Sequence, residues 1–279
     1  MTSFWRKARN HSFTLLAGLA CALALVPLVS ITWYVAARGI PALSWSFLTH
    51  APTAPDDPAS GIGPALAGTG LLVLLAGVLG IPLGIAGGMW LAEHGRNARG
   101  SAFRMVLDAM AATPSIVTGI FVFTIVVIPQ GHFSAFAGGI ALALMIVPVV
   151  ARTTEIALRG VPDSLREAGV ALGATHTRTL FRVALPAART GILTGSILAT
   201  ARVAGETAPL LFTALYAQQW VHSLGKPIAA LPTLIFNYIQ QPYPSLQQQA
   251  WGAAFLLFVL VFGANIVVRV SSHLRSRQP

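Results

Sequence analysis

The chain alternates long uncharged stretches with short polar segments that are rich in arginine. Residues 12–37 carry no formal charge, and neither do residues 109–151. A helix needs roughly 20 apolar residues to cross a bilayer, so the first stretch fits one span and the second fits two. The turn-forming cluster at residues 129–132 (Pro-Gln-Gly-His) predicts the break between those two spans.

This pattern predicts an all-α integral membrane protein with six transmembrane helices. Residues 12–37 are too long for the roughly 7 to 15 residue core of a cleaved signal peptide, so we expect this first span to be retained. Thr113-Pro114-Ser115 predicts a kink or an unwound turn near the start of the third span. The proline-containing segment 216–249 predicts an irregular loop with one interfacial helix. The expected spans cover residues 12–37, 65–92, 105–128, 135–151, 190–215 and 250–268.

Composition and charge agree with a membrane protein. Hydrophobic residues make up 55% of the chain and charged residues 9%, whereas soluble domains carry about 25% charged residues. The formal charge of +10 does not indicate a nucleic-acid partner, because the basic residues lie between spans rather than in one patch. Fifteen of the 18 lysines and arginines fall in the two tails and in the segments after the second and fourth spans. The positive-inside rule therefore places both termini in the cytoplasm.

The sequence offers no catalytic or metal-binding constellation. The single cysteine, Cys21, lies in the first span and cannot form an intramolecular disulfide. The seven histidines show no HExxH or paired spacing, so neither a metal site nor a cofactor is predicted. No GxxxxGK[ST] segment is present, so the chain does not itself supply a P-loop ATPase.

The fifth predicted span carries two charges, Arg202 and Glu206. A charge at the centre of a bilayer costs roughly 3 kcal/mol on insertion scales, so such residues normally line a pathway or a binding site. Their spacing of four predicts that a helix places both side chains on one face. The alternative is a structural ion pair that holds helices together. Three further cations are weaker pathway candidates: Arg38, Arg152 and Lys226.

The longest cytoplasmic segment covers residues 152–189. Ser164 and Glu167 fit a capping box, and Gly173 is a suitable helix end. A second amphipathic piece, residues 177–185, is expected to stop at Pro186. A short apolar stripe fits either insertion into a partner's groove or packing against the chain's own bundle, and the pattern does not decide between them. The stripe consists of Leu165, Ala168 and Leu172.

This segment resembles the EAA loop of ABC-importer permeases. The similarity rests on Glu167-Ala168-Gly169, Gly173 and Leu185-Pro186, and Gly169 replaces the second alanine of the motif. Three further stretches are similar to PstA-type permease subunits of bacterial phosphate importers: residues 61–69, 148–155 and, most specifically, 201–211 (ARVAGETAPLL).

The resemblance implies a type I ABC-importer permease fold in the bacterial inner membrane. It implies that Glu167, Ala168, Gly169, Gly173, Leu185 and Pro186 contact an ATPase subunit, and that Arg202, Glu206 and Thr207 line the substrate pathway. The implied partners are a PstC-like second permease, a dimeric PstB-like ATP-binding subunit and an extracytoplasmic PstS-like phosphate-binding protein. The implied organisation is residues 1–64 for the first span and external loop, 65–270 for the permease core, and 271–279 for a cytoplasmic tail.

Phosphate chemistry fits this pair of charges. A guanidinium binds two phosphate oxygens at once, so Arg202 can replace part of the lost hydration. An ionised Glu206 accepts hydrogen bonds and donates none, and it can therefore accept the proton that orthophosphate keeps and sulfate lacks. The alternatives are a permease for molybdate, sulfate or phosphonate, an intramembrane enzyme that uses Glu206 as acid or base, and a secondary carrier or channel. An intramembrane enzyme is disfavoured because the spans contain no paired nucleophile and base. A secondary carrier or channel is disfavoured because it would leave the EAA-like loop without a function.

Overall fold

The computed structural model of the chain describes residues 2–95 and 97–275. Residue 96 and residues 276–279 lie outside this part, so only the first residues of the predicted tail 271–279 are described. Every regular element in the described part is helical. The helices are α1 (Thr2–Gly39), α2 (Trp45–Thr49), α3 (Gly63–His94), α4 (Ala98–Ala112), α5 (Ser115–Val122), α6 (Ile128–Gln130), α7 (Ala135–Arg159), α8 (Asp163–Ala171), α9 (His176–Thr179), α10 (Leu185–Val203), α11 (Ala208–Thr213), α12 (Leu231–Tyr238) and α13 (Pro244–Arg275), with a short 3-10 helix η1 (Ile40–Ala42) and two π-helical turns, η2 (Phe123–Val127) and η3 (Leu180–Ala184).

The membrane spans agree with the predicted number. Within the described residues, five helical stretches are long and apolar enough to cross a membrane: Arg9–Ala42, Gly63–His94, Ala135–Arg159, His176–Val203 and Pro244–Ile266. A sixth span is formed if α4 and the α5–α6 stretch count as one, and these two halves meet at an angle of 101°. The predicted kink at Thr113-Pro114 is therefore confirmed. Proline has no backbone N–H and disfavours a helical conformation in the residue before it, which explains the break.

The centre of the fold is the pair α3 and α7, which cross in close contact. A row of glycines on α3 makes this approach possible, since a Cβ atom on Gly84 would lie 2.6 Å from the Cβ of Val150. Gly80 and Gly88 meet α7 in the same way, at Ile146 and Thr154. Helix α10 also packs on α7 and completes the buried core.

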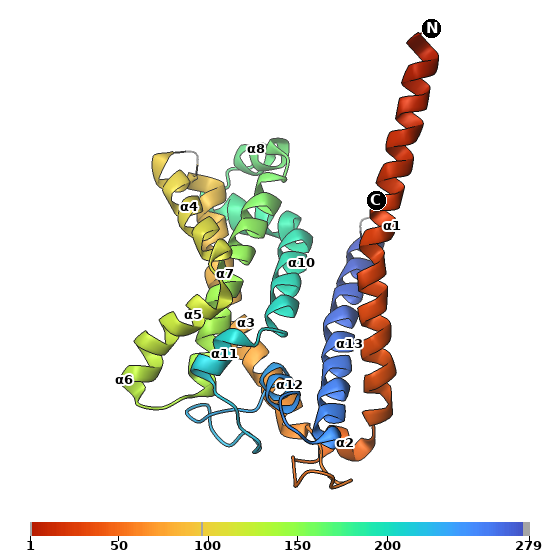
Figure 1. Cartoon of the computed structure of the whole chain (residues 1–279). Helices are drawn as coiled ribbons and strands as arrows, with labels where there is room; N and C mark the ends of the chain where they lie inside the picture. The colour runs from red at the N-terminus through yellow and green to blue at the C-terminus, as the bar shows by residue number, and fades with distance from the viewer. Residues whose placement is uncertain (1, 96, 276–279) are drawn as a thin grey trace.

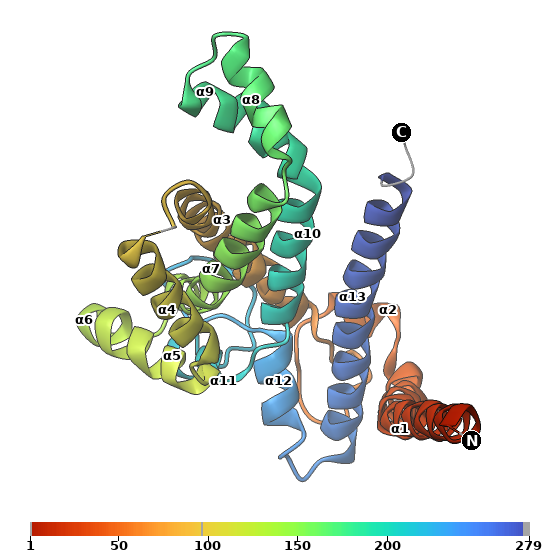
Figure 2. The ribbon, with the colours of Figure 1, turned by 90° about the horizontal axis from the view of Figure 1, so that it is seen from above.

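The remaining helices surround this core (Figure 1). Helices α1 and α13 lie side by side along one flank, and α4, α5 and α6 lie on the opposite flank, as the view from above also shows (Figure 2). Helix α8 lies at the end of the molecule toward which the start of α1 and the end of α13 point, whereas α2 and α12 lie at the other end (Figure 1). The arginine-rich loop and both termini are thus directed to one end.

Several predicted boundaries are wrong. The fifth span is not continuous from 190 to 215, because α10 ends at Val203 and a separate α11 follows. The helical path also does not stop at Pro186, because the π-helical turn η3 carries it into α10. Helix α13 begins at Pro244, so the glutamine run at 247–249 is helical rather than part of the loop. A helix is present in this region as predicted, and it is α12.

Candidate functional site

A cavity of about 220 Å³ lies where two broken spans meet. Its walls come from the end of α4, the break between α4 and α5, the middle of α7, and the end of α10 with the turn that follows. The lining residues are Met110, Ala111, Ala112, Thr113, Pro114, Ser115, Met145, Val149, Ala199, Arg202, Val203 and Glu206. Irregular backbone at membrane depth is tolerated where it is buried in protein or lines a cavity, and both breaks fit that description.

The second break follows α10. Gly205 and Glu206 lie between α10 and α11, and Pro209 lies in the first turn of α11. The short helix α11 packs on α5, so the two breaks face each other. Gly119 of α5 makes this contact possible, because a Cβ atom there would lie 2.7 Å from the Cα of Pro209. The cavity is thus enclosed by half-helices, an arrangement common in transporters.

Arg202 and Glu206 are arranged differently from the sequence-based prediction. The two residues do not share a helix face, because Arg202 lies in the last turn of α10 and Glu206 lies beyond its end. Both nevertheless line the cavity. No salt bridge joins them, and among the described residues Arg202 has no carboxylate partner. The structure therefore does not support a structural ion pair, or direct neutralisation of Arg202 by Glu206.

Thr207 is not among the residues that line this cavity. It is the N-cap residue of α11, and its carbonyl oxygen accepts hydrogen bonds from the backbone N–H groups of Leu210 and Leu211 at 3.1 and 3.2 Å. Thr207 therefore fixes the start of α11 through its backbone.

The three weaker cationic candidates have other contacts. Arg38 packs its guanidinium over the ring of Tyr34, with 5.4 Å to the ring centroid. The backbone carbonyl of Lys226 accepts a hydrogen bond from the Ala135 N–H at 2.9 Å. Arg152 forms salt bridges to Glu155 at 3.0 Å and to Asp108 at 3.4 Å. None of the three lines the cavity.

Glu155 is the centre of a charge cluster that sequence reasoning missed. Its side chain is 3% exposed and pairs with Arg104 at 2.8 Å, Arg152 at 3.0 Å and Arg159 at 3.0 Å. The cluster joins α4 to α7 close to the cavity, since Val149 lies one turn before Arg152. The spacing of Arg152, Glu155 and Arg159 on α7 gave a local signal, but the contribution of Arg104 depends on the tertiary packing.

Helix α8 presents its apolar stripe to the outside. Leu165 and Leu172 are exposed, and the Leu172 side chain is 90% exposed. Of the two interpretations left open by the sequence, packing of the stripe against the chain's own bundle is therefore wrong. The predicted capping box is also wrong, because Pro162 is the N-cap residue and no side chain caps the helix.

The C-terminal end of α8 is as predicted. Gly173 has φ +81° and ends the helix, with hydrogen bonds from Gly173 N–H to Val170 O at 2.8 Å and from Ala174 N–H to Gly169 O at 3.1 Å. Gly169 is buried against α9, where an added Cβ would lie 3.1 Å from Thr179 Cγ2. This contact explains why glycine rather than alanine occupies that position.

An apolar groove of about 410 Å³ runs between α8 and α9. Glu167 lies in this groove, whereas Leu185 and Pro186 lie farther along the chain at the start of α10. The structure therefore brings only part of the predicted contact set together. The groove is lined by Arg166, Glu167, Val170, Ala171, His176, Thr179 and Leu180.

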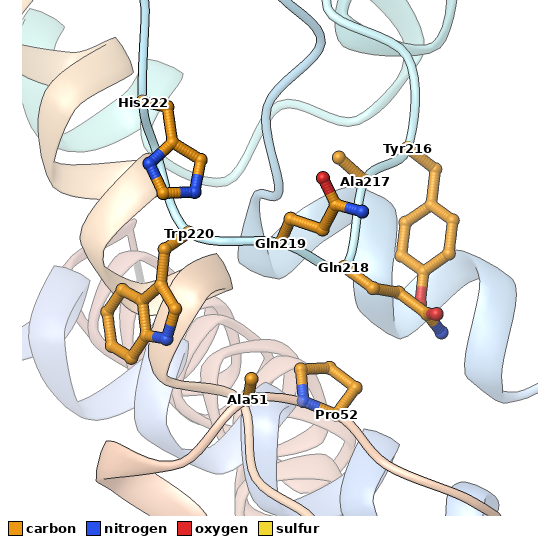
Figure 3. Close-up of a pocket in the computed structure, with 8 residues that line it drawn as sticks. All are labelled: Ala51, Pro52, Tyr216, Ala217, Gln218, Gln219, Trp220 and His222. Carbon is orange, nitrogen blue, oxygen red and sulfur yellow. The ribbon is translucent and has the colours of Figure 1, made fainter.

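A larger cavity of about 780 Å³ lies at the opposite end of the molecule from α8. Figure 3 shows its lining, with Ala51 and Pro52 below a loop that carries Trp220 and His222. Burial raises the pKa of the Tyr216 phenol. The lining contains no carboxylate, lysine or arginine.

Comparison with known proteins identifies the family. The family model described as binding-protein-dependent transport system inner membrane component matches residues 80–276. The phosphate transport system permease protein PstA of Yersinia pestis is 44% identical to this chain over 267 residues, which cover 95% of this chain and 90% of that protein. This chain belongs to the PstA family of transport permeases.

Other PstA-family proteins match over a similar length. The PstA protein of Haemophilus influenzae is 39% identical over 96% of this chain and 95% of its own length. A probable PstA protein of Methanocaldococcus jannaschii is 38% identical over 95% of this chain and 94% of its own length. As a PstA-family member with several apolar helices, the chain is a multi-pass protein of the cytoplasmic membrane.

A solved structure confirms the fold of this PstA-family chain. The MetNI methionine ABC transporter, solved in inward-facing conformations, matches with a TM-score of 0.58 and 19% sequence identity. The match covers 77% of this chain and 94% of the MetNI chain. The predicted type I ABC-importer permease fold is thereby confirmed.

Proposed function

We propose that this chain is the permease subunit of an ATP-driven importer that moves inorganic phosphate across the cytoplasmic membrane. The observation that carries this proposal is Arg202, a guanidinium that lines a cavity between two broken spans and has no carboxylate partner in the described part of the chain. A permanent cation in this position calls for an anionic ligand, and a guanidinium suits phosphate oxygens. The phosphate permeases among its relatives support the choice of phosphate over other oxyanions.

The energy source is a partner subunit. We assign the dimeric PstB-like ATP-binding subunit to the groove and the exposed tip at α8, with Glu167, Ala168 and Gly169 on the contacting helix and Gly173 ending it. Leu185 and Pro186 then serve to join this loop to α10 rather than to contact the partner. This assignment requires α8 to face the cytoplasm, in agreement with the arginine-rich segments at that end and with both termini inside.

Two further partners complete the proposed importer. A PstC-like permease supplies the other half of the pathway, since six spans enclose little space for a solute. A PstS-like extracytoplasmic protein delivers phosphate to the end opposite α8. Membrane lipid covers the apolar outer surfaces of α1 and α13.

The test is phosphate uptake by the reconstituted complex. Proteoliposomes that contain this chain with its partner permease, ATP-binding subunit and binding protein should import labelled phosphate only with ATP. Arg202→Gln should reduce uptake by at least about 100-fold, the size of effect found when a group that stabilises charge is removed. Arg189→Gln is the matched control, because Arg189 is an exposed arginine on the same helix outside the cavity. Normal uptake by Arg202→Gln would remove Arg202 from the pathway.

A further inference from the structure

The corner between α7 and α8 is held by side-chain contacts in addition to backbone hydrogen bonds from Gly160 to Ile156 and from Val161 to Leu158. The chain passes from Arg159 through Gly160 and Val161 to Pro162, where α8 begins without a side-chain cap. Beyond these backbone hydrogen bonds, no residue of this three-residue link has a side chain that can form a hydrogen bond or a salt bridge to the membrane helices. The contacts around this corner therefore decide whether α8 moves with the membrane helices or independently of them.

Arg166 connects three helices at this corner. Its Nη2 donates to the carbonyl oxygen of Leu158 in the last turn of α7 at 3.0 Å. Its Nη1 donates to Glu93 Oε1 in the last turn of α3 at 2.6 Å. The Glu93 side chain is only 6% exposed, and charge-assisted hydrogen bonds in such surroundings are short and strong.

A second arginine makes the reciprocal contact. Arg159, in the last turn of α7, donates from Nη2 to the carbonyl oxygen of Leu91 in the last turn of α3 at 3.2 Å. The C-terminal ends of α3 and α7 thus each present a carbonyl oxygen to a guanidinium from another helix, which also suits the negative end of a helix dipole. The ends of α3, α7 and α8 are consequently joined into one unit.

Glu93 is also contacted from the groove between α8 and α9. His176 Nε2 lies 2.6 Å from Glu93 Oε2, and Arg166 and His176 both line that groove. Any force that a partner applies in the groove therefore reaches Glu93 through two side chains. The effect continues into the transport cavity, because α3 packs along α7 and α7 contributes Met145 and Val149 to its lining.

From this geometry we propose that Glu93 is a positioning residue that makes the α8–α9 loop move as one body with α3 and α7, so that partner movement reaches the membrane helices. The proposal rests on the proposed docking of an ATP-binding subunit at α8. Glu93 itself touches neither nucleotide nor cargo. Its removal should leave ATP hydrolysis running while it disconnects hydrolysis from transport.

The experiment measures phosphate imported per ATP hydrolysed in proteoliposomes that hold the complete complex. Glu93→Ala should lower this ratio by about fivefold, a typical effect for a residue that couples two sites. The double variant Glu93→Ala with Arg166→Ala should lower the ratio by less than the product of the two single effects, because the two residues share one ion pair. Arg99→Gln, which removes an exposed charge from the same cytoplasmic surface, should leave the ratio unchanged.

His176→Ala provides a second variant that does not threaten folding, because the His176 side chain is 75% exposed. It removes one of the two contacts to Glu93 and should lower the ratio by about twofold. If Glu93→Ala prevents assembly of the complex, the ratio measured for His176→Ala tests the proposal instead. An unchanged ratio in an assembled variant, or a parallel fall of uptake and hydrolysis, overturns the proposal. A wild-type complex without ATP-dependent uptake would instead refute the proposed function.

Discussion

Gly119 of α5 lies directly against Pro209 of α11, with no side chain between the two short helices. A Cβ atom on Gly119 would lie 2.7 Å from the Cα of Pro209 and 3.3 Å from its carbonyl oxygen. Both neighbours are backbone atoms, which cannot rotate away as the end of a flexible side chain can. The contact joins the two broken spans that border the cavity lined by Arg202.

Gly119→Ala should therefore destabilise the protein by about 1 to 3 kcal/mol, the usual effect of overpacking, and reduce phosphate uptake. The measurement is the apparent thermal unfolding midpoint in detergent together with uptake in proteoliposomes. Gly70→Ala is the control, because nothing lies within 4 Å of a Cβ atom at Gly70 on α3. Equal midpoints for the two variants would show that α5 and α11 adapt to the added methyl group.

Glu206→Gln should weaken the discrimination between phosphate and sulfate. The amide donates hydrogen bonds that an ionised carboxylate lacks, so sulfate loses less on entering the cavity. We expect sulfate to compete about tenfold better, equivalent to roughly 1.4 kcal/mol. Equilibrium dialysis of labelled phosphate against the solubilised permease measures this without the binding protein.

Asp163→Asn serves as the control for Glu206→Gln, because Asp163 is an exposed acid on α8, away from the cavity. An unaltered phosphate-to-sulfate ratio in Glu206→Gln, with phosphate still bound, would argue against a selective role for Glu206.

Leu172→Ser should weaken the association with the ATP-binding subunit. Burial of a leucine side chain contributes roughly 1.5 to 3 kcal/mol, so affinity should fall at least about tenfold. Quantitative co-purification of the two subunits over a range of partner concentrations gives this value. Leu224→Ser, an exposed leucine in the loop at the other end of the molecule, should have no effect. Undiminished association of Leu172→Ser would place the contact elsewhere.

Glu155→Gln should destabilise the fold by about 3 kcal/mol, because it leaves several arginines around a buried position without their counter-charge. The thermal unfolding midpoint in detergent should fall accordingly. Asp108→Asn is the matched control, since Asp108 is exposed and its single pair with Arg152 contributes at most about 1 kcal/mol. A similar midpoint for both variants would mean that the buried cluster adds little to stability.

The features that could be predicted from the sequence depend on local chemistry. Long apolar runs specify spans, Pro114 breaks the helix at its own position, and Gly173 adopts a left-handed conformation that other residues avoid. Each of these effects acts within a few residues of the chain. Arg202 could likewise be predicted as a pathway residue, because it is a charged residue within a largely apolar stretch.

The errors arose where tertiary packing decides. A continuous fifth helix was expected because residues 190–215 form one largely apolar stretch, but α10 ends at Val203 and the separate helix α11 packs on α5. The role of Glu93 could not be predicted, because its partners Arg166 and His176 lie 73 and 83 residues away. A buried acid with distant basic partners leaves no spacing pattern in the sequence.

The exposed leucine at the end of α8 affects how the subunits need to be synthesised relative to one another. Leu172 is almost fully open to water, and an exposed apolar surface of this kind favours association with other proteins. On the proposed assembly, chains made in excess of the ATP-binding subunit would leave this apolar surface open to water and prone to self-association. Matched synthesis of the subunits would limit this self-association.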